Sequence, residues 1–147
     1  MLQQTLVVLK PDAVERGLMG QIISRLERAS LKITRMQMRR IDYDFAHAHY
    51  GDLEPRIGTE AYEAVCRFMQ SGPVVAMQVE GDGAVAVVRK LIGSTMPADA
   101  APGTIRGDFC HMGKQTGAQA VLNLVHASGT VDEAEAELTL WFGEAGA

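Results

Sequence analysis

The residues best suited to chemistry lie near the carboxyl end of the chain, around His126 and Glu137. Residues 120–125 form an apolar run that is typical of a strand and stops directly before His126. Residues 131–142 are predicted to be a helix, because apolar residues recur there at helical spacing. Glu137 lies at the edge of that apolar stripe, so its carboxylate is expected to lean toward the imidazole.

A carboxylate that accepts a proton from one imidazole nitrogen leaves the other nitrogen free to react. His126 is therefore a candidate nucleophile, and Glu137 is the candidate partner that orients its ring. The same pattern also fits a histidine that only satisfies local hydrogen bonds at the end of a strand. Position in the sequence leaves both interpretations open.

Other cationic and hydrogen-bonding side chains lie on separate segments of the chain. The candidates are Lys10, Arg89, Thr95, Arg106 and Asn123. The chain contains neither a P-loop nor a dinucleotide-binding fingerprint, so any phosphate must be held by side chains. Together these groups could neutralise a polyphosphate and allow an imidazole to attack its terminal phosphorus. Each also has a simpler interpretation as a surface charge or a capping group.

The composition indicates one globular domain with a buried core. The chain has 147 residues, of which 47% are hydrophobic and 22% are charged. A net charge of −4 argues against a nucleic-acid partner. Cys66 and Cys110 form no metal or redox motif, and no protein metal site is predicted. We expect no membrane partner and a cytoplasmic location, since no signal peptide or membrane-spanning run is present.

Apolar periodicity predicts strands over residues 5–9, 31–40, 74–79 and 120–125. Helices are predicted after Asp12, from residue 21, and over residues 42–52, 61–69, 84–92 and 131–142.

Local signals add detail to these elements. Asp12 is expected to cap the first helix, because Glu15 completes a capping-box pattern, and Asp44 is expected to cap the helix over 42–52. Residues 54–60 are expected to be a loop, and residues 93–109 a long irregular segment of the kind that often carries function. His47 and His49 are two residues apart, so on a helix they should point to different sides and share no metal.

Without the additional helices, this order of elements is βαββαβ, the ferredoxin-like arrangement. The predicted fold class is therefore α+β, with a four-stranded, mostly antiparallel sheet and helices on one of its faces. No repeat or linker divides the chain, so residues 1–147 should form a single domain. This architecture carries enzymes, RNA-binding modules and regulators, so it does not assign a function.

Several short motifs follow one another along the chain. They are KPD at 10–12, SGPVVAM at 71–77, PAD at 97–99, PGTIRGDF at 102–109, NxxHAS at 123–128 and LWF at 140–142. In this order they resemble the nucleoside diphosphate kinase family from about residue 5 to residue 142. The motifs at 102–109 and 123–128 are long and specific, which makes a chance match to both very improbable.

The resemblance implies a ping-pong transfer of the γ-phosphate from a nucleoside triphosphate, typically ATP, to a nucleoside diphosphate through a phosphohistidine. It implies that His126 is the nucleophile, that Glu137 orients it and that Lys10 is a catalytic cation. The residues implied to contact substrate or to surround the histidine are Lys10, Tyr50, Arg89, Thr95, Arg106 and Asn123. Mg²⁺ would arrive with the nucleotide, and a homo-oligomer, a dimer-based tetramer or hexamer, is implied.

Three features depart from the family pattern. The segment around residues 54–62 is longer, so either Tyr62 stacks on the base from a shifted position or the loop clamps the base differently. The segment over residues 111–122 is also longer than in the common form of the family. Gly129 stands where the family usually has Asp, so a hydrogen bond of that Asp must be lost or replaced.

Two alternatives to an active enzyme follow. These departures fit a catalytically weak or inactive homologue with a scaffold or regulatory role. An RNA-binding or ligand-sensing module is disfavoured by the negative charge and by an aromatic content of 5%.

Overall fold

The computed structural model describes residues 1–111 and 120–143. In chain order its strands are β1 (Leu2–Leu9), β2 (Lys32–Arg39), β3 (Val74–Asp82) and β4 (Val125–Ala127). Its helices are α1 (Pro11–Glu15), α2 (Met19–Arg28), α3 (Tyr43–His49), α4 (Glu54–Ile57), α5 (Thr59–Met69), α6 (Ala84–Ile92), the 3₁₀ helix η1 (Pro97–Asp99), α7 (Ile105–Phe109) and α8 (Val131–Phe142). Within these residues, every helix is too short or too polar to cross a lipid bilayer.

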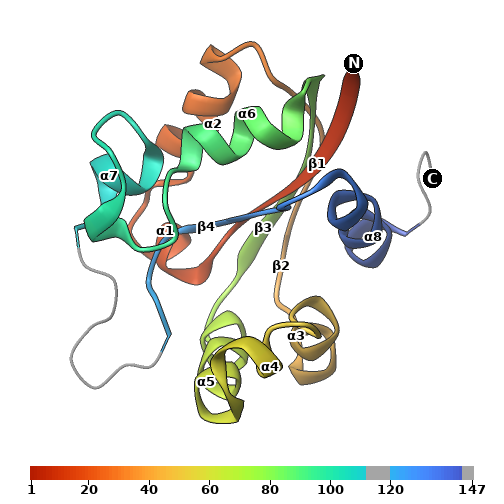
Figure 1. The fold of residues 1–147 in the computed structure, drawn as a ribbon, viewed down its shortest axis with the longest axis vertical. Helices are drawn as coiled ribbons and strands as arrows, with labels where there is room; N and C mark the ends of the chain where they lie inside the picture. Colours follow the sequence, from red (N-terminus) through yellow and green to blue (C-terminus); the bar gives the residue numbers. More distant parts are fainter. Residues whose placement is uncertain (112–119, 144–147) are drawn as a thin grey trace.

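The strands form one sheet in the order β2-β3-β1-β4, and each of its pairings is antiparallel (Figure 1). This confirms the predicted α+β, ferredoxin-like fold. The order places β1 between β3 and β4. His126 lies directly opposite Val8 of β1, so both side chains are on the same face of the sheet.

Helices cover both faces of the sheet, so the prediction that they pack on one face is wrong. On one face, Val7 and Leu9 join a core with α2 and α6. On the other, Leu6 and Val8 join a core with α5 and α8. Because all four of these β1 side chains are apolar and fully buried, the strand requires cover on both sides.

The last strand differs from its prediction in position. β4 contains His126 in its middle, whereas the predicted strand over 120–125 ended before it. Leu124 has a φ of +72°, which is incompatible with extended backbone, so the strand cannot begin before Val125. The nucleophile candidate is therefore held by the sheet rather than at a loose strand end.

Four further local predictions are wrong. Residues 93–109 are expected to be irregular, but they contain η1 and α7. Residues 54–57 form α4 instead of a loop. Asp42, not Asp44, caps α3 by accepting a hydrogen bond from the backbone of Phe45. Asp12 makes no capping bond to α1, because its carboxylate instead accepts the backbone N–H of Leu124, far away in the sequence.

The helix α8 has the predicted bounds, 131–142. At its start, the Thr130 side chain accepts a hydrogen bond from the backbone N–H of Glu133, at 3.1 Å. At its end, Arg35 and Arg39 of β2 donate to the carbonyls of Phe142 and Trp141. The helix that carries Glu137 is thus stabilised at both ends.

We expect Thr130→Ala to lower the free energy of unfolding by about 1 kcal/mol, because the substitution removes the N-cap of α8. Urea denaturation measures the change. Thr139→Ala is the matched control, since that exposed hydroxyl only bonds back to the carbonyl of Glu135 within the helix. Equal unfolding free energies for the two variants would contradict the capping role.

Candidate active site

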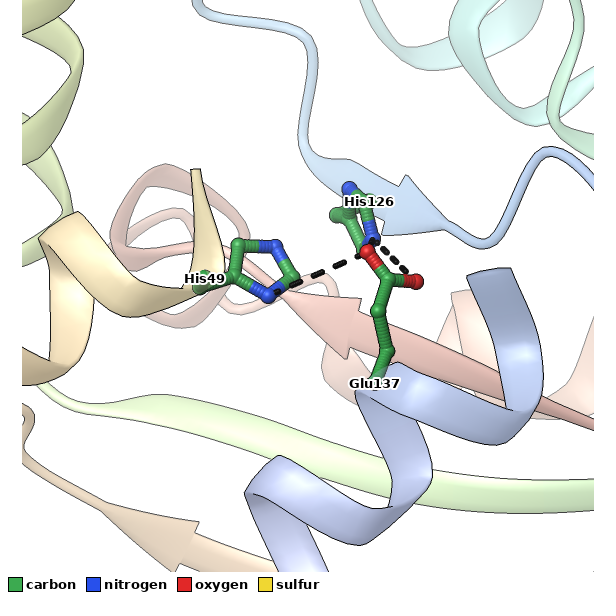
Figure 2. A group of neighbouring side chains, drawn as sticks. All are labelled: His49, His126 and Glu137. Carbon is green, nitrogen blue, oxygen red and sulfur yellow. Dashed lines mark hydrogen bonds and ion pairs between the residues drawn. The ribbon is translucent and has the colours of Figure 1, made fainter. Parts of the chain in front are cut away.

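His126 and Glu137 form a direct contact across the interface between β4 and α8 (Figure 2). His126 Nε2 lies 3.1 and 3.0 Å from the two carboxylate oxygens of Glu137. Ser128 donates its hydroxyl to Glu137 Oε1 at 2.6 Å. Burial raises the pKa of Glu137, but the hydrogen bonds from His126 and Ser128 outweigh it and hold the pKa below its ordinary value.

A charged carboxylate only accepts hydrogen bonds, so the proton of a neutral His126 ring lies on Nε2. The lone pair is then on Nδ1, the nitrogen that does not face Glu137. The His126 side chain remains 20% exposed, which leaves it accessible to a ligand. The arrangement is that of an oriented imidazole nucleophile.

His49 also contacts His126, and sequence reasoning missed this contact. The His49 and His126 rings meet edge to face, with centroids 4.4 Å apart. Trp141 Nε1 donates to His49 Nδ1 at 2.9 Å. Burial, aided by the nearby His126 and Lys10, holds the pKa of His49 well below its usual range, so this ring is neutral. The partners lie far apart in sequence, so no local pattern could have indicated the contact.

Among the residues that the structure describes, His49, His126 and Glu137 are the one group of three that could hold a metal ion, with ligand atoms within 4.8 Å of one another. Two imidazoles and a carboxylate suit zinc-like ions, whereas Mg²⁺ prefers oxygen ligands. His49 Nδ1 already accepts from Trp141, and Glu137 already binds His126 and Ser128. This group does not fit a magnesium site.

The segment around His126 brings together several of the predicted phosphate-binding residues. Lys10 Nζ donates to Asn123 Oδ1 at 2.8 Å, and Asn123 Nδ2 donates to the backbone carbonyl of Thr95 at 2.8 Å. Arg89 Nη1 donates to the carbonyl of Ala127 at 3.3 Å. These four residues therefore converge on the stretch just before and after the nucleophile.

Arg106 lies behind this stretch and is 3% exposed. Its guanidinium donates to the backbone carbonyls of Asn123, Gly93 and Val125, at 3.1, 3.1 and 2.6 Å. Burial, and then the charge of Arg89, lowers its pKa to about 10. Arg106 thus holds the backbone on the amino-terminal side of His126 in addition to contributing positive charge.

The two tyrosines that are candidates for substrate contact have different surroundings. Tyr50 lies beside His126, and the centroids of the two rings are 6.3 Å apart. Tyr62 is 5% exposed, and its hydroxyl donates to the carbonyl of His47. Helix α5 turns Tyr62 into the core, on the same face as Cys66 and Met69, so its ring is not free to stack on a base. The structure contradicts that role for Tyr62.

A cavity of about 540 Å³ lies between the α3–α4 segment and α8. His126 and Glu137 form part of its wall, with His49, Tyr50, Arg56 and Glu133 among the other lining residues. Lys10, Arg89 and Arg106 do not line it. The cavity therefore reaches His126 from the side of Glu137 and does not include these three cationic side chains.

Comparison with known proteins assigns the family. The family model for nucleoside diphosphate kinase matches residues 3–146. The chain belongs to the nucleoside diphosphate kinase family. Relatives of that name include one from Pyrococcus furiosus, 49% identical over 95% of this chain and 83% of the relative. Another, from Archaeoglobus fulgidus, is 46% identical over 97% of this chain and 88% of the relative.

Solved structures of nucleoside diphosphate kinases agree with this family assignment. The enzyme from Borrelia burgdorferi, a transition-state mimic with bound vanadate and ADP, matches with a TM-score of 0.90 and 39% identity over 96% of this chain and 87% of that one. The enzyme from Halobacterium salinarum, in complex with CDP, matches with a TM-score of 0.87. It is 40% identical over 98% of this chain and 90% of that one. The chain is therefore a phosphotransferase that acts between nucleotides.

The structure also explains one departure from the nucleoside diphosphate kinase pattern. Glu133 of α8 accepts the backbone N–H of Gly129 at 2.9 Å. A Cβ at position 129 would lie 2.7 Å from that carboxylate oxygen. A carboxylate oxygen of α8 thus lies too close to position 129 for the Cβ of the family's usual Asp, unless Glu133 shifts. Most of the second long segment, 112–119, lies outside the described residues.

Lys10 leads to a pH prediction. Burial, and then the charge of Arg106, lowers the pKa of Lys10 to about 8, against the opposing charge of Asp12. Above that pH the ammonium loses its proton in the free enzyme, and with it the attraction for phosphate. We therefore expect kcat/KM for ATP to fall as the pH rises through about 8.

Steady-state kinetics from pH 6 to pH 10 measure this fall in kcat/KM. Lys10→Arg keeps its charge throughout the range, so its profile should lack the fall. A wild-type profile that stays level up to pH 10 would show that Lys10 does not titrate where burial places it.

Proposed function

We propose that His126 carries the phosphoryl group in this member of the nucleoside diphosphate kinase family. The observation that carries the proposal is the hydrogen bond from His126 Nε2 to Glu137, which leaves Nδ1 with its lone pair. Nδ1 attacks the γ-phosphorus of a nucleoside triphosphate, and the bond to the bridging oxygen breaks as the diphosphate leaves. A terminal oxygen of a second nucleoside diphosphate then attacks the same phosphorus, and the P–N bond breaks.

Glu137 supports both steps by stabilising the positive charge that the ring gains when Nδ1 is phosphorylated. Ser128 holds the carboxylate in place. Neutral His49 adds no positive charge beside the ring, so it does not oppose the formation of that charge.

The phosphates of the substrate are bound by the groups around Asn123 in this proposal. Lys10 and Arg89 supply positive charge from two segments, and Arg106 adds to it from behind the backbone. Such charge stabilises the equatorial oxygens of a transferring phosphoryl group. Members of this family use a divalent metal ion, and we infer that Mg²⁺ enters as part of the nucleotide substrate.

Incubation with ATP followed by mass-spectrometric mapping of phosphate tests the proposal. We expect one acid-labile phosphate on His126 and loss of turnover in His126→Ala. His47→Ala is the matched control, because His47 pairs with Glu63 and should leave the labelling unchanged. Wild-type protein that takes up no phosphate would instead favour the inactive homologue with a scaffold role.

We further propose one domain over residues 1–147, ATP and other nucleoside di- and triphosphates as substrates, a cytoplasmic location, and a homo-oligomer. The last is supported by β2, which lies at the edge of the sheet and exposes Met36 and Met38 by 51% and 54%. An unpaired strand edge with exposed apolar side chains is a surface that a second copy can cover.

Light scattering coupled to size exclusion measures the assembly. We expect a mass that is a multiple of a dimer, and Met38→Lys should shift it toward smaller species. Ile57→Lys is a matched control, because Ile57 is an apolar residue exposed by 40% on α4 rather than on β2. A wild-type mass equal to one chain would refute the assembly.

A further inference from the structure

The three residues before His126 form a strained turn. The backbone N–H of Val125 donates to the carbonyl of Asn123 at 2.8 Å, which closes a γ-turn around Leu124. Leu124 has a φ of +72°, although its side chain is bulky and fully buried in the core. A γ-turn with positive φ is rare, and such strain persists only where the surroundings enforce it.

Arg106 binds the carbonyls on either side of Leu124, and two groups at the end of β1 and the start of α1 bind Leu124 itself. The backbone N–H of Lys10 donates to the carbonyl of Leu124 at 2.8 Å. The carboxylate of Asp12 accepts the N–H of Leu124 at 3.1 Å. Asp12 is only 8% exposed, and its other oxygen has no hydrogen-bond partner among the described residues. A buried carboxylate is costly to retain, which indicates that its bond to the turn has a specific role.

The turn separates two side chains with different tasks. Asn123, on its near side, binds Lys10 and the carbonyl of Thr95. His126, two residues after Leu124, binds Glu137 on α8. If Leu124 relaxed to negative φ, the chain direction would change between them, and the phosphate-binding groups would lose their alignment with the nucleophile.

We propose that Asp12 is a positioning residue that keeps Leu124 in the γ-turn and so aligns His126 with the groups around Asn123. This rests on the function proposed above, and it assigns Asp12 a part in catalysis without contact with substrate. The capping-box pattern had suggested only a local role for this carboxylate in α1.

The negative charge of Asp12 also acts on Lys10 and raises the pKa of its ammonium group. Among the described residues, the charges that act on Lys10 are those of Asp12 beside it and of Arg106 from α7, and the nearby His49 from α3 is neutral. Asp12 is the negative one, so removing its charge makes Lys10 lose its proton at lower pH. The two roles of the carboxylate, as hydrogen-bond acceptor and as charge, can therefore be separated by substitution.

The first experiment compares Asp12→Asn with Asp12→Ala in single-turnover phosphorylation of His126 by ATP. Asn keeps an acceptor for the Leu124 N–H, so its rate at pH 7 should stay close to wild type while its alkaline limb moves to lower pH. Asp12→Ala removes the acceptor. Its rate per folded molecule should fall about tenfold, which corresponds to the free-energy cost of holding one residue in the left-handed conformation. Glu15→Ala removes an exposed carboxylate of the same helix and is the control.

The second experiment tests the strain itself. Leu124→Ala and Leu124→Gly leave the same cavity to within one methyl group, but only glycine adopts positive φ freely. Combined with Asp12→Ala, the glycine variant should phosphorylate about tenfold faster than the alanine variant. A purely structural role for Asp12 would change the melting temperature and leave these rates per folded molecule alike.

Equal rates for the two double variants, or a wild-type rate in Asp12→Ala, would overturn the positioning role. Absence of phosphate on wild-type His126 would instead refute the proposed function. The two failures are distinguishable because each experiment includes the wild-type protein.

Discussion

The site depends on the buried guanidinium of Arg106, which binds three backbone carbonyls from two separate segments. Two of them, of Asn123 and Val125, flank the strained residue Leu124. The third, of Gly93, ties the end of α6 to the same point. A planar group with several fixed donors can hold such a stretch where regular strand pairing cannot, since Leu124 is excluded from the sheet by its positive φ.

Antiparallel pairing with β1 then fixes His126. His126 shares the face of Val8, which is the face covered by α8, and so it meets Glu137 directly. Trp141 of the same helix fixes the neutral ring of His49 against His126. The His126 ring is thus flanked by a carboxylate that accepts the hydrogen bond of its Nε2 and by the neutral imidazole of His49.

Two departures from the family pattern have local physical explanations. At position 129, the Glu133 carboxylate fills the space that a side chain would need, so the lost Asp is matched by an acid from the neighbouring helix. At position 62, the tyrosine lies on the face of α5 that packs into the core, which removes it from the candidates for base stacking. Neither change disturbs the contact between His126 and Glu137.

The sequence by itself determined the order of the four strands and of the longer helices, the bounds of α8 and the pairing of His126 with Glu137, because these follow from local apolar periodicity and from motifs of specific residues. It also indicated a set of candidate phosphate-binding residues, namely Lys10, Arg89, Thr95, Arg106 and Asn123. Only the tertiary structure decided that helices cover both faces of the sheet, that His49 contacts the nucleophile, and that Asp12 binds Leu124 rather than its own helix. These contacts join residues far apart in the chain, and a propensity or spacing rule describes only neighbours.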